Sequence, residues 1–167
     1  VSAINNLPAL YFDGNDFLRI ENLPTTAIAS ENEITIFVVQ NVKSSNLATF
    51  TINSSTQTLA NSGERIMLNA YNSSDRVEKN YGSPSYLAKP QVISAIKNSS
   101  SSSFYINSKL EVTANTSSVL NTSLNRYLEI GTSFDGHIGE ILIYNRALRV
   151  KERMLIEQYL MKKWKIK

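Results

Sequence analysis

One amphipathic helical pattern closes a chain that otherwise reads as strands and turns, and this combination narrows the possible architectures. Residues 134–164 begin with an Asp-Gly turn and continue with apolar residues from Ile138 to Tyr144, as in a buried strand. After Arg146 the spacing of apolar residues changes to that of a helix, over about residues 150–164. We therefore expect a sheet protein that ends in a single helix.

This helical segment has an apolar stripe and a charged side. Its apolar stripe contains Leu155, Ile156, Tyr159 and Leu160, and its polar side contains Lys151, Gln158 and Lys162. The pattern predicts a helix that lies against a β-sandwich and does not cross its core.

The rest of the chain is divided into many short strands by turn residues. Residues 34–39 are apolar on both alternating faces, which predicts a central strand covered from both sides. Residues 76–81 carry few apolar side chains, so they are expected on an exposed face or edge. Short strands at this spacing indicate an all-β fold, a two-sheet antiparallel jelly-roll sandwich, with the helix at the C-terminal end. No fixed repeat argues for a propeller or solenoid.

Length and charge favour one ordinary globular domain over residues 1–167. The 17 basic and 14 acidic residues give a net charge of +3. Much of the basic excess consists of lysines near the end of the helix, where positive charges complement the helix dipole. We therefore expect no nucleic-acid partner. Cysteine is absent, which excludes disulfides and thiolate chemistry. No stretch has the length of a membrane span and no signal peptide opens the chain, so we expect no membrane insertion by these residues. The first residue is Val1 and not Met, so we expect a mature chain or an excised module.

Three stretches of the sequence match the pattern of a known family. They are the terminal strand with its Tyr-Asn-Arg-Ala-Leu corner at 144–148, the strand at 10–14, and the hairpin at 104–107, where Ser108 replaces the usual glycine. These stretches resemble laminin-G-like, concanavalin A-like lectin–glucanase jelly-roll domains of bacterial surface proteins. The resemblance implies a sandwich whose first and last strands are neighbours. It also implies an extracellular or cell-surface location and glycan or protein binding, with enzymes as a minority.

The acidic residues and the one histidine do not form a catalytic pattern. Glycoside hydrolysis needs two carboxylates held at a fixed separation, whereas Glu31, Glu33, Glu129 and Glu140 read as solvated charges at strand ends. His137 has no nucleophile or orienting carboxylate assigned by any motif, so it reads as a structural or surface residue. We expect no catalytic residues and no enzyme activity.

Aspartates at a turn raise the question of calcium. The sequence Asp13-Gly14-Asn15-Asp16 offers several oxygen atoms, but its spacing fits no EF-hand. These residues also form turns in their own right. We expect no cofactor and no metal ligands, with a structural calcium ion left as an alternative.

A cluster of tyrosines and planar polar groups in the middle of the chain is the candidate ligand site. It consists of Tyr71, Asn72, Asp75, Arg76, Asn80, Tyr81 and Tyr86. Tyrosine rings pack on apolar sugar faces and keep a hydroxyl for hydrogen bonding, and Arg76 with Lys79 and Lys89 favours an acidic glycan. The sequence thus predicts a non-catalytic, lectin-like carbohydrate-binding adhesion module. The alternatives are a glycoside hydrolase or polysaccharide lyase of the same fold, and a structural or protein-binding module of an adhesin or pilin.

Overall fold

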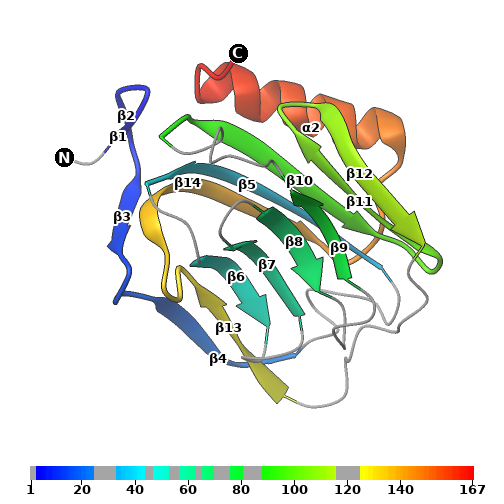
Figure 1. Ribbon diagram of the computed structural model, residues 1–167, viewed down its shortest axis with the longest axis horizontal. Coiled ribbons are helices and arrows are strands. Elements are labelled where there is room, and N and C mark those ends of the chain that lie inside the picture. Colours follow the sequence, from blue (N-terminus) through cyan, green and yellow to red (C-terminus); the bar gives the residue numbers. More distant parts are fainter. Residues whose placement is uncertain are drawn as a thin grey trace.

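In the part of the chain that the structure describes, two antiparallel sheets form a sandwich and a C-terminal helix lies against it (Figure 1). The computed structural model describes residues 3–24, 33–43, 47–52, 57–62, 65–69, 76–80, 88–115 and 125–167. Within these ranges it describes side chains at 4–21, 33–43, 88–115 and 128–167. The two-sheet sandwich with a C-terminal helix confirms the predicted fold class.

Among the described residues, each main sheet has six strands. Sheet I has the order β12 (Lys109–Asn115), β11 (Ser101–Ile106), β10 (Gln91–Lys97), β5 (Ile34–Val42), β14 (Asp135–Tyr144), β3 (Leu10–Asp13). Sheet II has the order β4 (Leu18–Pro24), β13 (Asn125–Ile130), β6 (Leu47–Ile52), β7 (Gln57–Ser62), β8 (Arg65–Asn69), β9 (Arg76–Asn80). A small hairpin joins β1 (Ala3–Ile4) to β2 (Leu7–Pro8), and α2 spans Val150–Lys163.

Strand β5 lies in the middle of sheet I and is covered on both faces, as its sequence predicts. Its inner face, with Ile36 and Val38, joins the core between the two sheets. Its outer face, with Phe37 and Val39, joins a second core under α2. All three layers therefore meet on this strand.

Three further predictions are confirmed. The opening strand β3 pairs with the terminal strand β14. Among the described strands, β9 is an edge strand of sheet II. The hairpin between β11 and β12 turns at Asn107 and Ser108, whose φ angles are 48° and 69°. Positive φ at both central residues defines a type I′ turn, so Ser108 takes a conformation that usually favours glycine. Asn107 Oδ1 accepts a hydrogen bond from Val92 N at 2.8 Å, which helps to hold the turn.

A buried threonine fixes the corner between β14 and α2. The Oγ1 atom of Thr35 donates to the carbonyl of Arg146 at 2.9 Å and accepts from Leu148 N at 3.0 Å. Glu33 accepts from Ala147 N at 3.2 Å. The Tyr-Asn-Arg-Ala-Leu segment therefore turns where it does because β5 satisfies its backbone groups.

Helix α2 packs on sheet I through a face that only partly matches the predicted stripe. Leu160 of that stripe is buried and Ile156 packs against the second core, whereas Leu155 and Tyr159 are 67% and 52% exposed. Arg153 and Glu157, outside the predicted stripe, are buried. Arg153 pairs with Glu157 at 2.5 Å, and Glu157 accepts from Ser94 Oγ of β10 at 2.7 Å. The prediction was wrong for Leu155 and Tyr159 because the sheet offers polar partners that allow this ion pair to be buried in their place.

The end of α2 is fixed to β14 by Trp164. Its indole N–H donates to Glu140 Oε2 at 2.8 Å, and Lys163 Nζ lies 2.8 Å from the same oxygen. Glu140 is therefore a structural acceptor, and the interpretation of it as a solvated charge was wrong. The ring covers Gly139, where an added Cβ would lie 2.6 Å from Cη2 of Trp164.

The contact between Gly139 and Trp164 predicts the effect of one methyl group. Gly139→Ala should lower the free energy of unfolding by about 1–3 kcal/mol, since the indole ring must shift. Urea denaturation of Gly139→Ala, Trp164→Leu and the double variant forms a cycle that isolates the contact. Because leucine leaves room for the methyl group, the same substitution should cost clearly less in the Trp164→Leu background. Equal costs in the two backgrounds would contradict this account.

The carboxylate of Glu152 gives the start of α2 a defined pH dependence. Two hydrogen bonds from Arg146, at 2.9 and 2.8 Å, and a third from Arg149 N at 2.8 Å lower the pKa of Glu152 to about 2. A carboxyl group with a depressed pKa stabilises the fold above its unfolded pKa and loses that effect as the pH falls through its folded pKa. Thermal melting from pH 5 to 2 should therefore show a steeper loss in the wild type than in Glu152→Gln. Parallel curves would refute this assignment.

Candidate functional site: the outer face of sheet II

The structure describes two of the seven predicted site residues. Arg76 and Asn80 lie at the two ends of β9 and, four residues apart, they belong to the same face of the strand. Tyr71, Asn72, Asp75, Tyr81 and Tyr86 fall outside the described residues. The tyrosine cluster thus stays a prediction, and Arg76 and Asn80 provide its structural reference points.

The strand register links Arg76 to a row of polar residues that crosses sheet II. Each member is the direct partner of the next on the neighbouring strand. This polar row, in order from β4 to β9, is Arg19, Glu129, Thr51, Thr58, Asn69 and Arg76. Directly opposed residues in a sheet share a face. Each of the six strands therefore places one polar residue of this row on the same face of the sheet.

The adjacent row is apolar at every position. Its members are Leu18, Ile130, Phe50, Leu59, Leu68 and Val77. Ile130 packs on the core between the sheets, and neighbouring residues of a strand alternate between faces. The apolar row consequently belongs to the inner face of sheet II, and the polar row belongs to its outer face.

One end of the polar row is an ion pair. Arg19 Nε donates to Glu129 Oε1 at 2.8 Å, and a second guanidinium nitrogen contacts the same oxygen. Thr132 Oγ1 donates to Glu129 Oε2 at 3.1 Å. Glu129 is only 5% exposed, so its interpretation as a solvated strand-end charge was wrong. The hydrogen bond that Arg19 donates to Glu129 is the main cause that raises the pKa of Arg19.

Removing Arg19 should destabilise the protein through the carboxylate left behind. Arg19→Met leaves the buried carboxylate of Glu129 with the hydrogen bond from Thr132 and without the guanidinium group, so we expect a clear loss in unfolding free energy. Urea denaturation measures it, with Lys151→Met on the exposed side of α2 as the control. Glu129→Gln should recover part of the loss in the Arg19→Met background. An unchanged unfolding free energy in Arg19→Met would show that the ion pair between Arg19 and Glu129 does not stabilise the fold.

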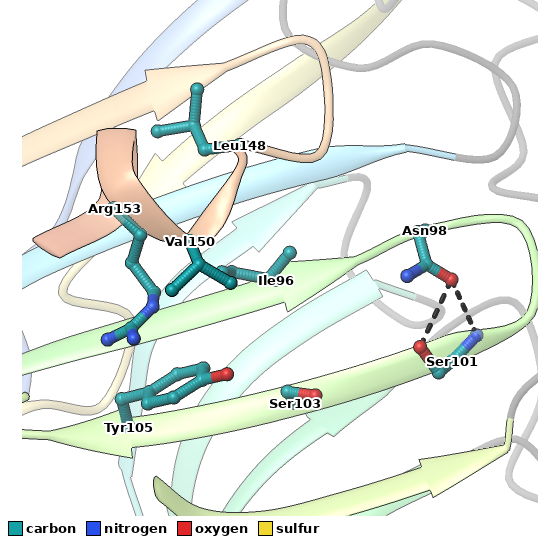
Figure 2. A pocket seen from close by; sticks show the side chains of 8 residues that line it. All are labelled: Ile96, Asn98, Ser101, Ser103, Tyr105, Leu148, Val150 and Arg153. Atoms are coloured by element: carbon teal, nitrogen blue, oxygen red, sulfur yellow. Dashed lines mark hydrogen bonds between the residues drawn. The ribbon is translucent and has the colours of Figure 1, made fainter. Parts of the chain in front are cut away.

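A cavity of about 150 Å³ lies between the start of α2 and strands β10 and β11 (Figure 2). Its polar groups already bind each other: Asn98 Oδ1 accepts from Ser101 N at 2.8 Å and Oγ at 3.1 Å, and Ser103 shares a hydrogen bond with Thr113. Figure 2 also shows Arg153 above Tyr105, with its Cζ atom 3.7 Å from the ring centroid. Most of these polar groups are therefore already paired, whereas the buried Nε atom of Arg153 has no hydrogen-bond partner among the described residues.

His137 belongs to a small cluster on the outer face of sheet I. Its ring centroid lies 5.1 Å from that of Tyr11, and Lys43 Nζ lies 4.2 Å from the Tyr11 centroid. Tyr11 donates to Asp135 Oδ1 at 3.3 Å. Burial, reinforced by Lys43 and opposed by Asp135, lowers the pKa of His137. This shift favours the neutral form of the ring.

The turn considered for calcium is stabilised by its own backbone. Asp13 Oδ1 accepts from Asn15 N at 2.9 Å, as in an Asx turn. Asp13 also lies opposite Asp135 in the register between β3 and β14. Within the described part of the chain, no three or more His, Cys, Asp or Glu residues are grouped so as to hold a metal ion. A structural calcium ion stays an alternative to the prediction of no metal.

Comparison with solved structures identifies the architecture. Domain 4 of a GH43 extracellular arabinanase from Geobacillus stearothermophilus, in complex with arabinotriose, superposes with a TM-score of 0.68 over 90% of this chain and 76% of that one, at 15% identity. The CBM40 of a Ruminococcus gnavus IT-sialidase, bound to α2,3-sialyllactose, gives 0.66 over 89% and 96%, at 12% identity. The fold is a jelly-roll β-sandwich.

The same fold occurs as part of larger proteins. The binding domain of botulinum neurotoxin serotype D gives a TM-score of 0.70 over 90% of this chain and 42% of that one, at 14% identity. No protein-family model and no curated protein matches the sequence. In the described residues, no helix is long and apolar enough to cross a membrane.

Sequence reasoning found one end of the polar row and missed the other. Arg76 stood out because β9 has few apolar residues, whereas Arg19, Thr51 and Asn69 look like ordinary alternating polar positions. A row across a sheet depends on strand order and register, and both arise from contacts distant in sequence.

Proposed function

We propose that this protein is a non-catalytic carbohydrate-binding module that recognises glycans through the outer face of sheet II. The polar row carries the proposal, because hydroxyl, amide and guanidinium groups bind sugar hydroxyls, and they occupy successive strands of one face. In the sequence, the predicted tyrosines flank β9 on both sides, which would add aromatic platforms next to Arg76.

Two comparisons support this proposal. The arabinanase domain and the sialidase CBM40 were solved with arabinotriose and sialyllactose, and this chain superposes on both over about nine-tenths of its length. From Arg76 we infer a preference for acidic glycans. We also propose a laminin-G-like adhesion module of a larger bacterial surface protein, outside the cell.

The non-catalytic assignment rests on how the carboxylates are used. Both oxygens of Glu129 accept hydrogen bonds from Arg19 or Thr132, so this group is poorly placed as a general base. The alternative is a glycoside hydrolase or polysaccharide lyase. It has one observation in its favour, the opposed pair of Asp13 and Asp135.

A glycan array of sialylated, uronic-acid and neutral chains tests the binding proposal. The wild type should bind acidic glycans, and Arg76→Ala should weaken binding at least tenfold, as expected for a lost charge-assisted hydrogen bond. Lys151→Ala removes the same charge from α2 and should bind like the wild type. A wild type that binds no glycan, or an Arg76→Ala variant that binds equally well, would overturn the proposal.

The same protein samples also test the alternative that the protein is an enzyme. Incubation with each bound glycan, followed by mass spectrometry, should show no shortened product. Product formation that is abolished in Asp13→Asn or Asp135→Asn would establish catalysis and replace the non-catalytic proposal.

A further inference from the structure

The side of the sandwich formed by β3 and β4 leaves core-facing apolar residues exposed. Leu10 lies opposite Ile138, while Leu18 and Ile20 lie opposite Ile130 and Leu128, so all three occupy inner-face positions. They are nevertheless 57%, 50% and 50% exposed. A fully enclosed core would bury such residues, so this side of the sandwich is an open apolar seam.

The two strands beside this seam are edge strands. Among the described strands, β3 ends sheet I and β4 ends sheet II, and Figure 1 shows the chain passing directly from one to the other. On the other side of the sandwich, the edge strands β9 and β12 are in contact. An exposed edge strand presents backbone N–H and C=O groups that can pair with another strand.

The charges on β4 match those of a second β4. Arg19 and Glu21 share the outer face on either side of Ile20, and Glu21 has a 63% exposed side chain. If two β4 strands pair antiparallel with Ile20 opposite Ile20, each Arg19 faces the Glu21 of the other copy. Opposite charges in directly opposed positions stabilise a strand pair, and the two apolar seams would meet on the inner face.

We propose that β4 is the interface of a symmetric homodimer, formed by antiparallel pairing of β4 with β4 of a second copy. The contact is isologous, because the same patch serves both partners. The two copies of sheet II then form one continuous sheet, and their polar rows lie on the same side of it. If the proposed glycan function holds, the two β9 strands present binding sites roughly 50 Å apart, from a strand spacing of about 4.8 Å.

Sedimentation equilibrium of the full chain over a range of concentrations tests the dimer without any glycan. The wild type should show a monomer–dimer equilibrium. Ile20→Lys, which places a charge at the centre of the pair, should weaken the dimer at least tenfold. Leu155→Lys on α2, a residue of similar exposure, should leave the dissociation constant unchanged.

Charge reversal tests the register of the pair. Glu21→Arg places Arg19 opposite a second arginine and should weaken the dimer, and 0.5 M NaCl should reduce the difference from the wild type by screening the repulsion. Thermal melting verifies that each variant is folded. A monomer at every concentration, or a dimer that Leu155→Lys weakens and Ile20→Lys does not, would overturn the proposal. These outcomes do not depend on whether the protein binds glycans.

Discussion

The burial of β5 on both faces is the constraint on which the rest of the architecture depends. Its inner residues need sheet II as a cover, and its outer residues need α2. Thr35, on the same strand, holds the corner that directs the chain from β14 into α2. One strand therefore fixes the number of layers and the path of the closing segment.

The sequence was informative wherever one strand's own pattern decides the outcome. The double-sided apolar run predicted β5, and the scarcity of apolar residues predicted that β9 lies on an exposed face or at an edge. It was misleading where partners come from elsewhere in the chain. Arg153 and Glu157 are buried because Ser94 and Tyr105 receive them, and Glu129 and Glu140 are structural because Arg19, Trp164 and Lys163 reach them. Periodicity alone carries no information about such long-range partners.

The candidate site could be predicted only in part for the same reason. A polar residue at every second position of an exposed strand is ordinary, and only the register shows that six of them fall in one row. Arg19 and Arg76, at opposite ends of that row, come from strands far apart in the chain. A position-by-position reading therefore finds strand faces but does not find a surface that several strands build together.

The contact between Trp164 and Gly139 also bears on how the protein folds. A helix of 14 residues is marginal in isolation, and this one is anchored to a site that exists only once β14 has joined sheet I. The strand that β14 joins on its other side, β3, is more than a hundred residues earlier in the chain. Until residues 135–164 are in place, the apolar outer face around Phe37 and Val92 has no cover. Productive folding therefore depends on late, long-range closure, and the uncovered sheet is the form most exposed to aggregation.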